Sequence, residues 1–249
     1  MAIKIGMNQS CIPSIPTLDY IELSADAGFN GVELRWEKIL DEKISSKELT
    51  AKCKEKGIEI ISLNALEMGN KEISAKSEEL IKMAMELNTP LIVVPPRPPI
   101  SSHEFHEMLH NISDTAKRYG TQLGFEFLGF TDAQINNIKQ AAEISVTYDM
   151  RLIVDTFHYF LSREDPDELK KYDVIILHIN DCTYAPAHPP QDDLARVLPG
   201  EGNFPLKKII KNYHGNWISL EIFRRYKMPP KKFAHVAIET LKKLVSDAF

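Results

Sequence analysis

The sequence has few cysteines and no long apolar run. Its three cysteines, Cys11, Cys53 and Cys182, are widely separated and form no CxxC pair, so neither a disulfide framework nor a zinc or redox motif of that kind is expected. No apolar stretch approaches the roughly 20 residues that cross a bilayer, and the start MAIKIGMNQS lacks the apolar core of a signal peptide. These absences predict a cytoplasmic protein with reduced thiols and no membrane partner.

The sequence also lacks an excess of basic residues. Asp and Glu number 35 against 30 Lys and Arg, for a formal net charge of −5. The lysine pairs are spread over segments that read as separate helices, so they do not form the basic stripe that binds nucleic acid. We therefore expect no nucleic-acid partner, while a homo-oligomer stays open.

What the sequence does contain is a regular alternation of short apolar runs and amphipathic stretches. The runs are nearly continuous, rich in β-branched and aromatic residues, and recur about every 30 residues, the length of a βα unit. Such runs are typical of parallel strands covered on both faces, and eight of them joined by right-handed crossovers close into a barrel. We predict an α/β fold with one domain, residues 1–249, a single (β/α)8 TIM barrel; an open doubly wound sheet is the alternative. The expected strands are residues 3–6, 31–34, 58–63, 91–94, 123–127, 151–155, 174–179 and 217–222.

One helix is predicted in detail. Apolar residues from Phe105 to Tyr119 follow helical spacing, Ser101 and Glu104 match a capping box, and Gly120 suits the position after the helix. Three histidines on this segment fall opposite its apolar stripe, so we interpret them as solvated rather than as metal ligands: His103, His106 and His110.

A long segment, residues 181–204, follows the seventh expected strand. It exceeds the usual length of a connection, and long loops in compact domains are often lids over functional sites. In a barrel of this kind it lies on the side where the βα loops gather, which is where chemistry takes place.

Four consecutive expected strands carry a polar residue at or near the carboxyl end: Glu126, Asp155, His178 and Glu221. Taken singly, such a residue is usually a hydrogen-bonded core group, but three carboxylates and one imidazole at matching depth do not neutralise each other. One divalent metal ion, Mn²⁺, Co²⁺, Zn²⁺ or Mg²⁺, explains this polar ring because its donors are three oxygens and a nitrogen. By the two-residue period of a strand, the side chains expected below the ring are Gly124, Ile153, Ile176 and Ser219.

At this point the whole chain resembles the xylose isomerase-like TIM barrel superfamily, in its sugar phosphate isomerase and epimerase branch. The motifs occur in order along the sequence. They are Glu33 in GVEL, Glu126 in GFEF, Asp155 and His158 in VDTFH, His178 and Asp181 in HIND, Arg196 in ARVLPGEG, and Ser219 and Glu221 in ISLEI.

The resemblance implies proton transfer next to a carbonyl, with the metal chelated by two neighbouring oxygens of a small sugar or polyol so that an enediolate can form. The substrate class is then a ketose, a cyclitol or a hydroxy-keto acid. By the same resemblance, Glu126 and Glu221 are the acid/base pair as well as ligands. His158 and Arg196 are expected to bind substrate oxygens and to stabilise the enediolate charge.

Other residues at strand ends have less specific assignments. Asn8 and Asn64 are expected to bind substrate, and Asp181 to support His178 or a neighbouring loop from outside the metal's ligand shell. Glu33 could be structural, and Trp36 could form a wall of the pocket or part of the core. Three arginines could also line the pocket: Arg97, Arg224 and Arg225.

Several activities compete with isomerase or epimerase. The same ligands serve metal-dependent dehydratases of the keto-inositol or dehydroshikimate type, and a non-catalytic sugar-binding barrel is a further alternative. An endonuclease of the apurinic-site repair branch is disfavoured, because its extra histidines are replaced here by SLNAL, VVPPRPP and LAR. The additional acidic set and lysine of the two-metal aldose isomerases are not found either, which favours one metal.

Overall fold

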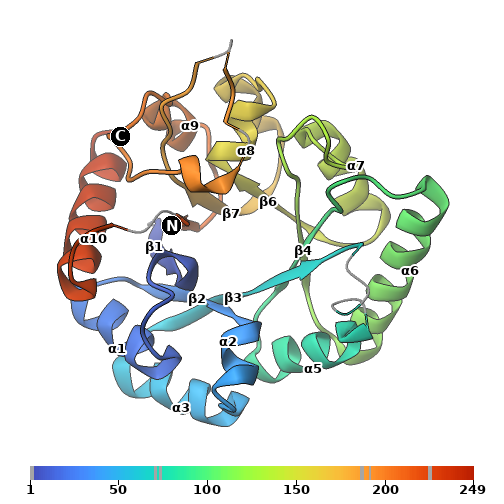
Figure 1. Ribbon diagram of the computed structural model, residues 1–249, viewed down its shortest axis with the longest axis horizontal. Coiled ribbons are helices and arrows are strands. Elements are labelled where there is room, and N and C mark those ends of the chain that lie inside the picture. The colour runs from blue at the N-terminus through green and yellow to red at the C-terminus, as the bar shows by residue number, and fades with distance from the viewer. Residues whose placement is uncertain (1–2, 70–71, 73–74, 186–187, 191, 224–225) are drawn as a thin grey trace.

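The chain folds into a closed barrel of eight parallel strands, as the sequence predicts (Figure 1). In this computed structural model the described residues are 3–249, except 70–71, 73–74, 186–187, 191 and 224–225. Pairing runs in chain order, and β1 pairs with β8 to close the barrel. The strands are β1 (Lys4–Asn8), β2 (Gly31–Arg35), β3 (Glu59–Glu67), β4 (Leu91–Val94), β5 (Leu123–Glu126), β6 (Arg151–Asp155), β7 (Val174–Ile179) and β8 (Trp217–Leu220).

Helices form a ring around the strands (Figure 1). Their apolar faces pack on the outer face of the barrel, which gives the main hydrophobic core. No helix among the described residues is both long and apolar enough to cross a membrane. The helices are α1 (Thr17–Ala27), α2 (Trp36–Asp41), α3 (Ser46–Lys56), α5 (Ser77–Leu87), α6 (Ser102–Tyr119), α7 (Ile138–Thr147), α8 (Thr156–Leu161), α9 (Leu206–Lys211) and α10 (Pro230–Ser246), with short 3₁₀ turns η1 (Gln9–Cys11), η2 (Pro166–Lys171) and η3 (Asp193–Ala195).

The helix predicted after residue 101 is α6. The Ser101 side chain accepts a hydrogen bond from the backbone N–H of Glu104, and Gly120 ends the helix in the left-handed conformation with φ 68°. His103, His106 and His110 are exposed as expected, although His106 Nδ1 also lies 2.7 Å from the Tyr148 hydroxyl. These histidines therefore take no part in the polar ring.

The inside of the barrel has its own small apolar cluster. Ile153 and Ile176 lie in it, as predicted, together with Ile61, Ile92 and Val94. Gly124 makes room for this packing, because a Cβ atom on it would collide with the Ile153 side chain. The barrel is thus filled with aliphatic side chains below the level of the polar ring.

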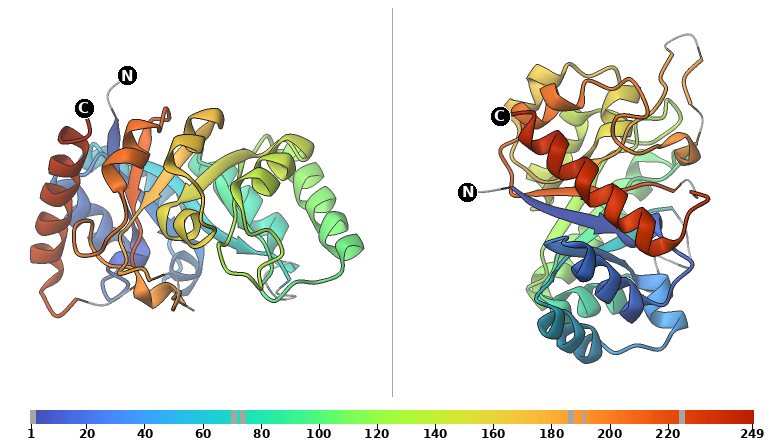
Figure 2. Two further views of the ribbon diagram at one scale, coloured as in Figure 1. Left: turned by 90° about the horizontal axis from the view of Figure 1, so that it is seen from above. Right: turned by 90° about the vertical axis from the view of Figure 1, so that its left-hand side faces the viewer.

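The ends of β1, β2, β3, β5 and β8 differ from the expected ones by one to four residues, and two of these differences affect the site side of the barrel. β3 continues to Glu67 instead of ending at residue 63, because its pairing with β4 resumes after a register shift and reaches Val94. β8 ends at Leu220, so Glu221 lies one residue past the strand, in the loop on the site side of the barrel. Figure 2 shows both chain termini at the end of the barrel opposite the loop that carries η3.

Candidate functional site

The four residues of the polar ring come together at the carboxyl end of the barrel. One candidate ligand atom from each of Glu126, Asp155, His178 and Glu221 lies within 4.8 Å of the other three, and all four residues are buried. Glu126 and Asp155 end β5 and β6, His178 is the penultimate residue of β7, and Glu221 directly follows β8. The structure therefore assembles all four predicted ligands at one point.

Strand register explains why the ring forms at one level. Asp155 pairs with His178, and the residues two positions earlier, Ile153 and Ile176, pair with each other. Because side chains alternate along a strand, the two pairs face the same way, with the isoleucines one layer deeper. A polar layer therefore lies directly on an aliphatic one.

His178 uses its two ring nitrogens in different directions. Nδ1 lies 2.8 Å from Glu126 Oε1 and 3.5 Å from Glu221 Oε2, whereas Nε2 lies 3.0 Å from Glu33 Oε2. Burial alone would lower the pKa of His178, but Glu33, Glu126 and Glu221 outweigh it and raise the pKa well above its usual value. Nδ1 is thus the imidazole nitrogen that faces Glu126 and Glu221 of the polar ring.

Asp155 is fixed in place by both of its carboxylate oxygens. Oδ1 caps α8 by accepting from the backbone N–H of Phe157 at 2.6 Å, and Nδ2 of Asn180 lies 3.1 Å from each oxygen. Burial and the nearby Glu221 raise the pKa of Asp155 to about 7, although the Arg196 guanidinium acts in the opposite direction. This carboxyl group can therefore exchange its proton near neutral pH.

The two glutamates of the ring have a similar environment. Burial raises the pKa of both Glu126 and Glu221, and their mutual repulsion adds to the shift of Glu221, against the lowering effect of His178 and Arg196. Asn8 donates from Nδ2 to Glu221 Oε1 at 2.9 Å. Asn8 is not among the described residues that line the cavity, and its contact with a substrate stays a prediction.

Arg196 reaches the ring from the loop after β7. Its side chain is 2% exposed, and Nη2 lies 3.2 Å from Asp155 Oδ2, while Nη1 lies 3.6 Å from Glu221 Oε2. Its guanidinium lies between the rings of Phe157 and Phe223, at 5.1 and 4.8 Å from their centroids. These contacts place a fixed positive charge beside two of the four ring residues.

Asp181 holds the base of this loop. It pairs with Val197 through two backbone hydrogen bonds, and its side chain accepts from the backbone N–H groups of Gly200 at 2.9 Å and Phe204 at 3.0 Å. Gly202 permits this packing, because a Cβ atom on it would collide with the Asp181 carboxylate. Of the two roles expected for Asp181, the structure supports the loop and not His178.

His158 lies beside Arg196, with Nε2 at 3.0 Å from Nη2 of the arginine. Burial and the positive charge of Arg196 hold the pKa of His158 well below its usual value, so the ring is neutral. Since the guanidinium can only donate, Nε2 accepts and the proton resides on Nδ1. Nδ1 is buried and has no hydrogen-bond partner among the described residues.

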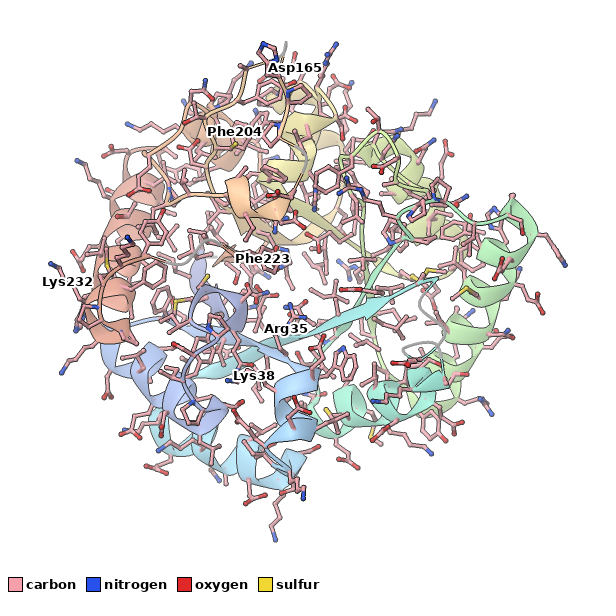
Figure 3. The ribbon with its side chains drawn as sticks, in the orientation of Figure 1. Arg35, Lys38, Asp165, Phe204, Phe223 and Lys232 are labelled. Carbon is pink, nitrogen blue, oxygen red and sulfur yellow. The ribbon has the colours of Figure 1, made fainter. Side chains whose placement is uncertain are left out.

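The polar ring lies at a cavity of about 620 Å³. Asn64 and Arg97 line it, whereas Trp36 does not and instead packs in the core, with Nε1 donating to the Ala65 carbonyl at 2.9 Å. Figure 3 shows two other lining residues, Arg35 and Phe223, toward the middle of the molecule. Arg224 and Arg225 lie outside the described residues. Apolar residues form much of the remaining wall: Met68, Val94, Pro95, Pro96, Pro98, Pro99, Ile100, Leu128 and Phe130.

The donor set fits a divalent cation. Three carboxylates lie within 4.8 Å of a ring nitrogen of His178, and two of them are close to Nδ1. A fourth carboxylate, Glu33, lies on Nε2, and Arg196 is the one arginine paired with the polar ring among the described residues. Negative charge therefore exceeds positive charge in a buried space, which a +2 ion would offset. Oxygen donors with one imidazole suit Zn²⁺, Mn²⁺, Co²⁺ or Mg²⁺.

Two contacts of the site were not predicted. The sequence indicates Glu33 only as part of a motif, yet its carboxylate contacts Nε2 of His178 across the barrel. Asn180, between His178 and Asp181 in HIND, is not among the predicted site residues, although its side chain donates to Asp155. Its position two residues after a ring residue was the one signal in the sequence that could have indicated it.

The comparisons with known proteins identify the family. The xylose isomerase-like TIM barrel family is matched over residues 21–244, so the chain belongs to that family. The inosose isomerase of Halalkalibacterium halodurans is 29% identical, with 94% of this chain and 92% of the relative covered. That of Bacillus licheniformis is 26% identical, with 96% and 98% covered. A crystal structure of the IolI protein with a bound zinc atom superposes with a TM-score of 0.87 at 25% identity over 99% of each chain. These relatives support an isomerase, as the resemblance implied.

Proposed function

We propose that the chain is a divalent-metal-dependent isomerase that moves a proton between neighbouring carbons of a ketose or a keto-cyclitol. The observation that carries the proposal is the buried polar ring at the base of a cavity, with two glutamates, a neutral histidine and an arginine at one point. The names of the inosose isomerase relatives favour a cyclitol as the first substrate to test.

Glu126, Asp155, Glu221 and Nδ1 of His178 would hold the metal. Bound there, a divalent cation would polarise a substrate carbonyl as a Lewis acid and increase the acidity of the adjacent C–H group. Asn180 and Asn8 keep Asp155 and Glu221 in position for this role through hydrogen bonds of 3.1 and 2.9 Å.

Glu126 and Glu221 are the groups that move the proton. One of them takes the proton from the hydroxyl-bearing carbon next to the carbonyl, and the electron pair of that C–H bond forms the double bond of an enediolate. The other gives a proton to the former carbonyl carbon, while the hydroxyl proton passes from one oxygen to the other. Burial raises the pKa of both glutamates in the metal-free site, whereas a bound cation would lower it, so proton removal would depend on the acidity that the metal gives the substrate.

His158 and Arg196 stabilise the negative charge that develops on the substrate oxygens. Arg196 is a buried cation held by Asp155 and Glu221, and it presents its charge without further reorganisation. His158 lines the cavity as a neutral ring, and its Nε2 accepts from Arg196 Nη2 at 3.0 Å, which orients the guanidinium. The pair thus combines a positive charge with a neutral ring that holds it in place.

Substitution Glu221→Gln tests the proposal. Deuterium entry into inososes, ketoses and hydroxypyruvate would be followed by NMR in deuterated water with saturating Mn²⁺, for wild type and variant. The wild type should exchange the proton beside the carbonyl, and the variant should be slower by about 10² to 10⁴-fold, the range for loss of a general acid or base. Glu67→Gln is the control, because it removes an exposed carboxylate at the mouth of the same cavity. An unchanged rate in the Glu221 variant, with its metal bound, would contradict the role of Glu221.

A further inference from the structure

Glu33 is a fully buried carboxylate that the proposed chemistry does not use. It lies on β2, across the barrel from β7, and it is not among the described residues that line the cavity. Its Oε2 accepts hydrogen bonds from Ser62 Oγ at 2.5 Å, Asn64 Nδ2 at 3.1 Å and His178 Nε2 at 3.0 Å. We infer that Glu33 is a positioning residue that fixes the orientation and tautomer of His178 for metal binding.

The contacts of Glu33 hold one of its two carboxylate oxygens, Oε2. Ser62 and Asn64 both come from β3, which pairs directly with β2 along the register that joins Glu33 to Ser62. The oxygen that meets His178 is therefore anchored by two donors on the neighbouring strand. Because this oxygen is already anchored, its hydrogen bond to Nε2 fixes the orientation of the His178 imidazole.

The orientation of the His178 imidazole follows from its contact with Glu33. With Nε2–H donated to Glu33, the nitrogen that can carry a free lone pair is Nδ1, which lies on the side of Glu126 and Glu221. Metal-binding histidines usually donate their other N–H to a carboxylate or carbonyl, and the partner also increases the basicity of the ligating nitrogen. Glu33 occupies the position of such a partner.

Glu33 is not itself in the set of candidate ligands. The atoms that lie within 4.8 Å of one another belong to Glu126, Asp155, His178 and Glu221, and Glu33 contacts the opposite nitrogen of the imidazole. Its effect on the metal must therefore pass through His178. This predicts a change in metal affinity, not the loss of a ligand.

The test is Co²⁺ titration of metal-stripped Glu33→Gln, read by visible absorption and by calorimetry. The variant keeps an oxygen for the three donors but removes the charge, so we expect a 10 to 100-fold higher Kd and an altered Co²⁺ spectrum. Glu67→Gln removes an equal charge from the cavity mouth without touching His178, and its Kd should change by less than about threefold. If Glu33→Gln does not fold, Ser62→Ala replaces it and should shift the Kd in the same direction by about 2 to 5-fold.

The inference rests on the proposed function only through the metal site, and the outcomes separate the two. A Glu33 variant with wild-type Kd and spectrum would overturn the role of Glu33, whatever the activity of the wild type. Equal weakening in both glutamate variants would also overturn it, because a general charge effect would then explain the result. A wild type that binds Co²⁺ but exchanges no substrate proton would contradict the isomerase proposal. The Kd values of the two glutamate variants would still decide the role of Glu33. No Co²⁺ binding by the wild type would overturn both.

Discussion

At the scale of single residues, the site is defined by an excess of negative charge. Glu33, Glu126, Asp155 and Glu221 are all buried, and the cationic groups beside them are Arg196 and the imidazole of His178. The direction of the pKa shift differs from one carboxyl group to the next. Burial would raise the pKa of Glu33, but His178 and the hydroxyl donors outweigh it and lower the pKa to about 2, whereas the pKa of Asp155 rises to about 7. Asp155 is thus one carboxyl group of this set whose proton a metal has to displace near neutral pH.

Metal affinity should therefore increase with pH through neutrality. Asp155 has a raised pKa of about 7, so below that pH it is protonated in the metal-free protein and competes with the metal, and above it the competition is lost. His178, whose pKa is raised by Glu33, Glu126 and Glu221 against burial, must also release its Nδ1 proton. The Kd for Co²⁺ should fall by about tenfold for each displaced proton per pH unit. Titrations at about pH 6, 7 and 8 check this, and a Kd independent of pH would show that no proton is displaced.

At the scale of elements, sequence reasoning located the strands better than their contacts across the barrel. Residues 151–155 and 174–179 form β6 and β7 as predicted, because continuous apolar runs between polar ends leave little choice of boundary. The residues below the polar ring on these strands, Ile153 and Ile176, follow from the period of two. The bond between Glu33 and His178 could not be predicted in this way, since it joins β2 to β7 and depends on the shear of the closed barrel. The partner of Asn8 was missed for the same reason, because β1 and β8 meet only when the barrel closes.

The loop after β7 depends on a few bonds at its base. Asp181→Ala should leave the N–H groups of Cys182, Gly200 and Phe204 without their acceptor and so loosen the segment that carries Arg196. We expect faster amide hydrogen exchange at residues 197–204, a higher KM and a lower kcat, because Arg196 would be held less firmly against Asp155.

A matched control for this loop is Asp173→Ala. Asp173 precedes β7 at the opposite end of the barrel, and its exposed carboxylate forms an ion pair with Arg151 at 2.7 Å. Exposed pairs of this kind contribute little to stability, so this variant should behave as the wild type. Protected amides at residues 197–204 in Asp181→Ala would show that the loop keeps its structure without this side chain.

At the scale of the whole molecule, the barrel separates a region that supports the fold from a region that carries the site. The aliphatic cluster of Ile61, Ile92, Val94, Ile153 and Ile176 fills the interior below the polar ring, and both termini lie at the end away from η3 (Figure 2). The proposed ligands come from four consecutive strand ends, β5 to β8. A bound metal would therefore link the second half of the barrel directly and the first half only through Glu33 and Asn8.

Metal binding should for this reason stabilise the folded molecule, because the four ligands are brought together only when the barrel is closed. At a free metal concentration about 100 times the Kd, the gain is about 2.7 kcal/mol, which for a chain of this size corresponds to a rise in Tm of roughly 5 to 10 °C. Differential scanning calorimetry with Mn²⁺ or Zn²⁺, and its reversal by a chelator, measures the effect. Asp155→Asn should show a smaller rise, because the amide is a weaker ligand than the ionised carboxylate. Hydrogen exchange should locate the added protection at the ends of β5 to β8, and equal protection around all eight strands would mean that the metal acts on the global unfolding equilibrium alone.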